Sequence, residues 1–253
     1  MIRWCYTIQK NPMATPGNRW KESLRLPLQF IGLLWAIHLF QVITRIDLGF
    51  LGIYPHKVIG LKGILFAPLV HADWQHLISN SVPFLVLTII LQFFYRRVAI
   101  RSFLMIYFLT GVAVWLFGRQ QVFHIGASGV VYGLVAFVFW SGVFRRSLQS
   151  IVLALIVTFL YSGYFMGILP NQEGISWESH LMGGLVGIFT SYWYREEIEQ
   201  DELPEKPSWE EDSQEEGRYF LDRDAFEKTK EQRRQEREDD QGHSGGGWFS
   251  NHT

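Results

Sequence analysis

The sequence predicts an all-α membrane protein in which six helices cross the bilayer and a disordered acidic segment follows them. Apolar residues make up 48% of the 253 residues, and they are gathered into six blocks separated by charged residues. Each block is close to the roughly 20 residues that a helix needs to cross a hydrocarbon core about 30 Å thick. The blocks are apolar nearly all round, whereas a surface helix of a soluble protein keeps a polar face.

The six predicted spans follow one another with short connections, except after the first. A short third block could by itself be a buried helix of a soluble core, but six such blocks in series argue against that alternative. No small-residue cleavage pattern follows the first block, which disfavours a cleaved signal peptide. The predicted spans are Leu26–Ile46, Leu77–Phe94, Ile100–Phe117, Ile125–Phe144, Leu148–Leu169 and Trp177–Trp193.

The distribution of Lys and Arg predicts that both termini face the cytoplasm, since cytoplasmic connections carry an excess of positive charge. The other connections are poorer in positive charge and hold only Lys57, Lys62 and Arg119. The positive charges lie before the first span and in the connections after the second and fourth spans: Arg3, Lys10, Arg19, Lys21, Arg25, Arg96, Arg97, Arg101, Arg145 and Arg146.

The charge changes sign at the end of the sixth span. Residues 1–194 hold 14 Lys and Arg against 5 Asp and Glu, a net charge of +9, whereas residues 195–253 hold 9 against 19, a net charge of −10. We therefore predict a basic cytoplasmic segment over 1–25, a membrane domain over 26–194 and an acidic, disordered cytoplasmic tail over 195–253. The tail is expected to be partly helical from about Asp222 to Glu238, and Trp248-Phe249 leaves open the alternative of a docking segment.

A serine and a histidine occupy matching positions in two of the spans. With the N-terminus inside, the second, fourth and sixth spans all run inward, so Ser128, His180 and the group His71, His76 and Asn80 share a depth near the outer face. Polar and ionisable side chains within a span are costly and indicate function. A hydroxyl becomes a nucleophile when a neutral imidazole within hydrogen-bond reach takes its proton, so we predict that Ser128 and His180 act together.

Glycines predict that the two spans touch. Gly129 and Gly133 form a GxxxG pattern directly after Ser128, and Gly183, Gly184 and Gly187 follow His180. Small residues at this spacing let membrane helices approach closely. On a helical wheel Gly184 and Gly187 lie within about 40° of His180, which places the histidine on the close-packing face. Tyr132, one turn after Ser128, is expected to support the imidazole ring.

Donors for a developing negative charge are expected from the second span. His76 and Asn80 are one turn apart and share a face, so a ring N–H and an amide N–H can point together. The backbone N–H of Ser128, near a helix start, is a third candidate. A Gly-x-Ser-Gly string or a single histidine is weak on its own, because both occur in membrane helices for packing or as water-bound residues. The coincidence of depth, helix direction and glycines favours a catalytic site.

The combined motifs resemble the rhomboid family of intramembrane serine proteases. They are Gly126-Ala127-Ser128-Gly129-x-x-Tyr132-Gly133, then Trp177-Glu178-Ser179-His180-x-x-Gly183-x-x-x-Gly187, and upstream His71-x4-His76-x3-Asn80. The resemblance covers about residues 26–194. It implies a six-helix bundle with a water-filled cavity open to the outside, Ser128 as nucleophile and His180 as general base. It also implies an oxyanion hole formed by His76, Asn80 and the Ser128 amide, with no acidic third member and no cofactor.

The long first loop departs from that family. It lacks the Trp-Arg pair often found there and has Gly60-Leu61-Lys62-Gly63 in that neighbourhood, which leaves its anchoring open. The sequence contains no nucleotide or metal motif, and its single Cys5 cannot form an intrachain disulfide.

Three function classes follow from these observations. The predicted function is a serine endopeptidase of a bacterial inner membrane that cuts transmembrane segments of other proteins near the outer face. The alternative is an inactive relative that binds membrane clients, although it would have no chemical need for both Ser128 and His180. A transporter would call for internal repeats and midplane charges, which the sequence lacks.

Overall fold

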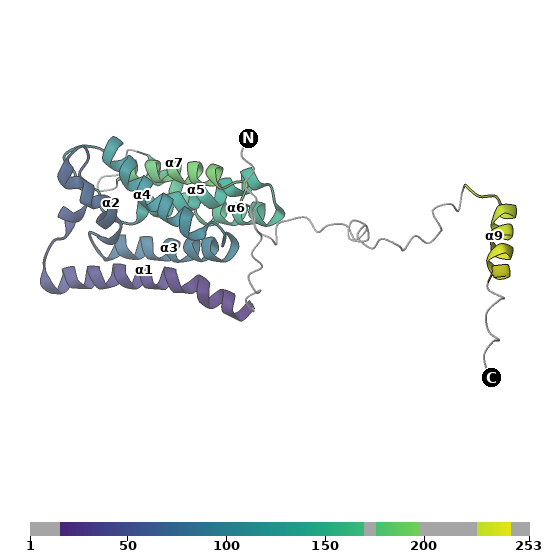
Figure 1. Cartoon of the computed structure of the whole chain (residues 1–253). Helices are drawn as coiled ribbons and strands as arrows, with labels where there is room; N and C mark the ends of the chain where they lie inside the picture. Colours follow the sequence, from purple (N-terminus) through teal and green to yellow (C-terminus); the bar gives the residue numbers. More distant parts are fainter. Residues whose placement is uncertain (1–15, 170–175, 198–226, 244–253) are drawn as a thin grey trace. The chain divides into compact units, whose positions relative to one another are not determined.

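The computed structural model describes residues 16–169, 176–197 and 227–243, and the regular structure in these ranges is helical. An isolated bridge between Ile53 and His124 is the single β pairing among the described residues. The chain divides into two compact units, Met1–Leu203 and Pro204–Thr253. The first unit holds the bundle of long helices, and the second holds one charged helix (Figure 1).

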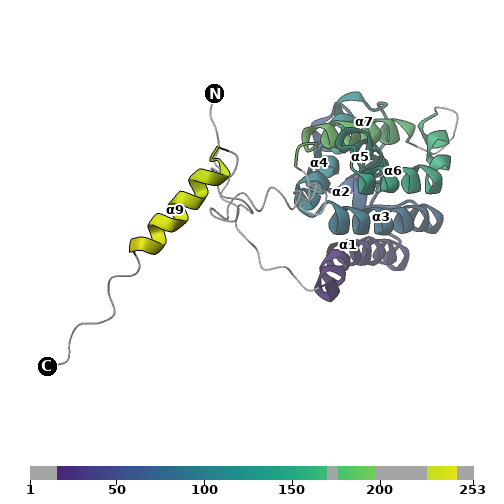
Figure 2. The ribbon, with the colours of Figure 1, turned by 90° about the vertical axis from the view of Figure 1, so that its right-hand side faces the viewer.

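The six longest helices in the described part of the first unit form its bundle. They are α1 (Pro16–Thr44), α3 (Trp74–Phe94), α4 (Ala99–Phe117), α5 (Ser128–Arg145), α6 (Leu148–Leu160) and α7 (Trp177–Trp193). Helix α5 is central, because it packs against α3, α4, α6 and α7. Helix α1 lies on the outside of α3, as both views of the ribbon show (Figures 1 and 2). The core between the helices is apolar and includes Phe84, Leu91, Ile106, Leu134 and Phe137.

The outer faces of the bundle are apolar too, which is the pattern of a multi-pass membrane protein. Ile43, Leu155 and Phe159 expose 72%, 65% and 84% of their surface, and lipid is the solvent that favours such exposure. In the part of the chain that the structure describes, four helices are long and apolar enough to cross a membrane, namely Lys21–Thr44 within α1, α3, α4 and α5. The predicted count of six spans is therefore not confirmed by helix length and composition.

The fifth predicted span is broken. Helix α6 ends at Leu160, and the chain continues at an angle of 62° as the 3₁₀-helix η4 (Ser162–Ile168), so that the pair is a fifth candidate span only when taken together. The unbroken helix predicted over Leu148–Leu169 is wrong in this respect. Gly163 and Gly167 lower the helix propensity beyond Leu160, and Gly167 is needed elsewhere, as described below. Helix α7 has 17 residues and is shorter than the four spans above.

The loop between α1 and α3 folds into short helical turns. These are η1 (Gly49–Leu51), η2 (Val58–Lys62), α2 (Gly63–Phe66) and η3 (Ala67–Leu69). A Cβ at Gly60 would overlap the backbone of Tyr54, so this glycine allows two parts of the loop to pack backbone on backbone. Helix α4 holds the loop: Tyr107 Oη donates to the Leu65 carbonyl at 2.5 Å, and Trp115 Nε1 donates to the Lys57 carbonyl at 2.9 Å. The loop is thus anchored by α4 without a Trp-Arg pair.

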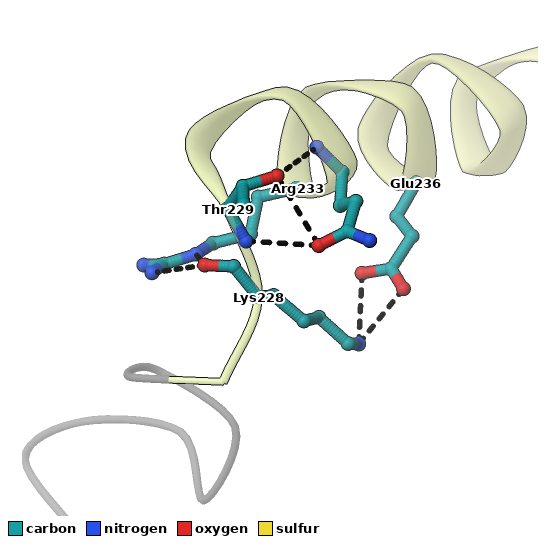
Figure 3. A network of polar contacts seen from close by, with 5 residues as sticks. Lys228, Thr229, Arg233 and Glu236 are labelled. Carbon is teal, nitrogen blue, oxygen red and sulfur yellow. Dashed lines mark hydrogen bonds and ion pairs between the residues drawn. The ribbon is translucent and has the colours of Figure 1, made fainter.

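The second unit contains helix α9 (Lys230–His243), which carries charged and polar side chains on every face. Thr229 precedes the helix and forms a reciprocal cap with Gln232: the Thr229 N–H donates to Gln232 Oε1 at 2.9 Å, and the Gln232 N–H donates to Thr229 Oγ1 at 3.4 Å. Lys228 Nζ pairs with Glu236 at 2.8 Å (Figure 3). Helix α9 begins at Lys230, whereas the predicted helical stretch begins at about Asp222. Residues 222–226 of that stretch lie outside the described ranges.

Candidate active site

A polar pocket of about 840 Å³ opens where the first turns of α3, α5 and α7 meet. It contrasts with the apolar surfaces elsewhere on the bundle and brings Ser128, His180, His76 and Asn80 to one place. Its other lining residues include Asp73, Gln75, Ser79, Arg119, Phe123, His124, Tyr132, Tyr164, Met166, Gly167 and Ser176.

The turn before α5 presents Ser128 as the first residue of the helix. Gly126 has φ of +102°, a conformation that side chains rarely adopt, and a Cβ there would collide with the His76 ring. The Gly126 N–H donates to the Ala67 carbonyl at 2.9 Å, and the Ala127 N–H donates to His71 Nε2 at 3.4 Å. This turn is why α5 begins three residues after the predicted start of its span at Ile125. As the first helical residue, Ser128 has a backbone N–H for which the helix itself supplies no acceptor.

His180 lies in the first turn of α7, and its ring is fixed on two sides. The ring stacks on Tyr132 with 4.1 Å between ring centroids and an interplanar angle of 8°. Its Nδ1 is 2.8 Å from the Gly167 carbonyl oxygen. Because a carbonyl can only accept, Nδ1 carries the proton and the neutral ring has its lone pair on Nε2. Tyr132 is held in turn by its hydroxyl, which donates to the Tyr164 carbonyl at 2.7 Å.

Gly167 is a site residue that the sequence reasoning missed. A Cβ at this position would overlap the Tyr132 hydroxyl and lie 3.2 Å from His180 Nδ1. The residue thus places its backbone carbonyl next to the Nδ1 side of the His180 ring. The only signal was a glycine near the end of an apolar block, and no spacing connects it with His180.

Helices α5 and α7 touch along a glycine seam, which is formed by Gly129 and Gly133 on α5 with Gly183 and Gly187 on α7. A Cβ at Gly183 would overlap the Gly129 carbonyl oxygen, and one at Gly187 would overlap the Gly133 carbonyl oxygen. Gly184, by contrast, has no atom within 4 Å of such a Cβ. The prediction that Gly184 shares the close-packing face is therefore wrong. Gly183 and Gly187 are about 40° apart on the helix, and the contact centred on them leaves Gly184 outside it.

The candidate oxyanion donors Asn80 and His76 line the same pocket as Ser128; Asn80 is buried and His76 is half-buried. Asn80 is 4% exposed, and its Nδ2 donates one of its two protons to the His76 carbonyl at 2.8 Å. The His76 ring lies against Gly126 and meets the His71 ring edge to face at 5.0 Å. His71 is fully buried behind the pocket. Burial, reinforced by His76, lowers the pKa of His71 to about 3, so this ring is neutral.

A second polar group at the pocket was not singled out in the sequence. His124, 3% exposed in the loop between α4 and α5, is hydrogen bonded through Nδ1 to Ser176 Oγ, and its Nε2 lies 3.1 Å from the Arg119 carbonyl. Arg119 Nε is 3.6 Å from the buried carboxylate of Glu178. Within residues 16–169, 176–197 and 227–243, no three His, Cys, Asp or Glu side chains cluster in a way that could hold a metal ion.

Comparison with known proteins adds a family to this geometry. The family model described as Rhomboid domain matches residues 60–197. Uncharacterized proteins of Mycobacterium tuberculosis and Mycobacterium bovis are 35% identical over 187 residues, covering 71% of this chain and 78% of theirs. An uncharacterized protein of Mycobacterium leprae is 35% identical over 182 residues, covering 69% and 72%.

Proposed function

Because the chain belongs to the rhomboid family, we propose that it is an intramembrane serine endopeptidase with Ser128 as nucleophile and His180 as general base. One observation carries the proposal. Ser128 and His180 line the same polar pocket within an apolar bundle, and the hydrogen bond from His180 Nδ1 to Gly167 leaves Nε2 able to accept a proton. A hydroxyl and a neutral imidazole in one pocket are the requirements for nucleophilic catalysis.

In the proposed acylation step, Ser128 Oγ attacks the carbonyl carbon of the scissile peptide bond while its proton passes to His180 Nε2. The charge that develops on the carbonyl oxygen is stabilised by the Asn80 amide, a His76 ring N–H and the Ser128 backbone N–H. The C–N bond then breaks, and the leaving amine takes the proton from His180. The Gly167 carbonyl keeps the imidazole in one orientation throughout, and the Tyr132 ring supports its face.

In the deacylation step, water in the pocket attacks the Ser128 ester. His180 Nε2 takes a proton from this water and returns it to Ser128 Oγ as the ester bond breaks. A pocket of about 840 Å³ has room for both water and an extended peptide. No group other than the residues described is required to move a proton.

The pocket is proposed to face the outside of a bacterial inner membrane, with both termini in the cytoplasm. Ser128 begins α5 and Arg145 ends it, and His76 lies at the start of α3 while Arg96 and Arg97 follow its end. The pocket and the basic connections therefore occupy opposite ends of the same helices, and positive charge favours the cytoplasmic side. With α6 joined to η4, and with α7, the bundle would cross the membrane six times. Its substrates would be transmembrane segments of other proteins, cut near the outer face.

To test the proposal, purified protein is incubated with a reporter membrane protein and with a fluorophosphonate, whose fluoride is displaced by an activated serine to give a phosphonate ester. We expect cleavage of the reporter, and labelling that maps to Ser128 and disappears in Ser128→Ala. A folded parent protein that neither labels nor cuts any of a panel of transmembrane reporters would contradict the proposal. Reporter binding without cleavage would favour the inactive, client-binding alternative.

A further inference from the structure

One imidazole and two serine hydroxyls form a hydrogen-bonded chain. It runs from the nucleophile loop, residues 118–127, to the first turn of α7. His124 Nδ1 bonds to Ser176 Oγ, and Ser176 Oγ is 2.7 Å from Ser179 Oγ. Ser179 directly precedes His180, and His124 is four residues before Ser128. The chain therefore joins the two segments that carry Ser128 and His180.

The direction of each hydrogen bond follows from the chemistry of its ends. His124 Nε2 faces the Arg119 carbonyl, which can only accept, so the proton of the neutral ring is on Nε2. Burial lowers the pKa of His124, which favours this neutral form. Nδ1 then accepts from the Ser176 hydroxyl, and Ser176 Oγ accepts from the Ser179 hydroxyl. Each proton in the chain therefore has an acceptor.

The backbone of His124 is itself fixed. Its N–H and carbonyl exchange two hydrogen bonds of 2.9 Å with Ile53 in the loop between α1 and α3. A Cβ at Gly52 would lie 2.8 Å from the His124 carbonyl oxygen, so the two stretches of chain are in close contact. His124 is thus a rigid point against which the start of α7 can be held.

Ser176 does not cap α7 with its side chain, although it is a serine directly before a helix. It is the N-cap residue of α7, yet its side chain makes no capping hydrogen bond. Serine at this position ordinarily accepts from a backbone N–H of the first turn, as Ser147 does at the start of α6, where it accepts from the Ser150 N–H at 3.2 Å. The Ser176 hydroxyl is directed to His124 instead, which indicates a requirement other than helix stability.

We propose that His124 is a positioning residue, which holds Ser176 and Ser179 and thereby sets the place of His180 relative to Ser128. The inference rests on the proposed function and assigns no contact between His124 and the reacting atoms. The glycine seam fixes how closely α5 and α7 approach, and the His124 chain fixes the height and rotation of the first turn of α7. The 3.6 Å contact between Arg119 and Glu178 joins the same two segments and would act in parallel.

The experiment compares the parent protein with His124→Leu, His124→Asn, Ser176→Ala and the double variant His124→Leu/Ser176→Ala. Leucine has a similar volume without polar atoms, whereas the Oδ1 of asparagine can take the place of Nδ1 and accept from Ser176. Ser147→Ala is the matched control, because it removes a serine before a helix that does cap and lies away from the pocket. For each variant the rate of fluorophosphonate labelling per folded molecule, kcat and KM for a reporter, and the unfolding temperature are measured.

We expect His124→Leu and Ser176→Ala to lower the labelling rate and kcat on the order of 10- to 100-fold with little change in KM, since a small misplacement of reacting groups has this effect. His124→Asn should recover most of the rate. The double variant should be no slower than either single variant, because both break one chain. Ser147→Ala should lower the unfolding temperature and leave the rate per folded molecule unchanged.

A parental rate in folded His124→Leu would overturn the inference, and so would additive losses in the double variant or a failure of asparagine to rescue. If His124→Leu cannot be obtained folded, Ser176→Ala and His124→Asn decide the matter by the same readouts. Should the parent itself fail to label at Ser128, the proposed function falls and the inference falls with it. Labelling of the parent with no effect of these variants removes only the inference.

Discussion

Replacing Gly183 by alanine, with Gly184→Ala as its neighbour control, tests whether the glycine seam brings Ser128 and His180 together. The two glycines are adjacent on α7, and each variant adds one methyl group. At Gly183 the new Cβ would overlap the Gly129 carbonyl oxygen and lie 2.8 Å from its carbonyl carbon. At Gly184 it would meet nothing within 4 Å. Composition and helix propensity change equally, so only the contact differs.

The magnitude follows from the geometry. Carbon atoms in contact rest about 3.5 to 4.0 Å apart, so a carbon at 2.8 Å from Gly129 must move away by about 1 Å. A misplacement of about 1 Å costs roughly 10²-fold in rate when two groups must be aligned. Overpacking should also lower the free energy of unfolding by about 1 to 3 kcal/mol. Gly184→Ala should be neutral or stabilising by up to about 1 kcal/mol, because alanine loses less entropy in a helix.

The assay is the second-order rate constant of fluorophosphonate labelling, measured at temperatures where each variant is folded, together with thermal unfolding in the same detergent. We expect Gly183→Ala to label about 10²-fold more slowly and to unfold earlier, and Gly184→Ala to match the parent. Equal rates for the two variants would refute the reasoning, because the methyl group at Gly183 would then not separate the helices that carry the reacting groups.

Four further outcomes are expected. Ser128→Ala and His180→Ala should each abolish reporter cleavage with little change in unfolding temperature, and the double variant should be no worse than either, since the two residues act as a unit. Asn80→Ala should lower kcat by about 10²- to 10³-fold through the loss of one donor, whereas an unchanged kcat would place the donor elsewhere. A chain ending after Glu197 should insert and cut like the parent, because no described residue after His180 lines the pocket; inactivity of the folded shortened protein would contradict this. Thermal stability should fall as the pH is lowered below 6.5. Burial lowers the pKa of His71 to about 3, so in this range the imidazole is protonated in the unfolded chain and not in the folded one. His71→Asn, compared at about pH 7 and about pH 5, should weaken this dependence of stability on pH.

The sequence could predict features that repeat along a helix or depend on its direction. Apolar blocks predicted the spans that became α3, α4 and α5, and the charge pattern placed Ser128 and His180 at helix starts on one side, where the structure brings them into one pocket. Helical spacing alone was too coarse to separate Gly183 from Gly184, because both lie within about a turn of His180. The distinction depends on where the partner helix lies.

Contacts between distant parts of the chain had no sequence signal. The hydrogen bonds between Gly167 and His180 and between His124 and Ser176 join segments that no periodicity connects. The break after α6, which precedes Gly167, likewise had no sequence signal. A glycine that supplies a carbonyl looks the same in sequence as one that permits packing. A serine before a helix looks like a cap until its hydroxyl is located.

The attachment of the loop between α1 and α3 has a consequence for how freely that loop can change. Tyr107 and Trp115 of α4 bind the carbonyl oxygens of Leu65 and Lys57, which belong to the main chain and are present whatever residue occupies those positions. The side chains of Leu65 and Lys57 take no part in these two hydrogen bonds, and Val58 and Ile59 are 82% and 61% exposed. Residues 57–59 and 65 can therefore diverge among relatives, or be redesigned for a different lipid surface, while the loop keeps its place on the bundle. The evolutionary constraint falls instead on Tyr107 and Trp115 of α4 and on the loop residues Ile53 and Ala67, which are buried against Val114.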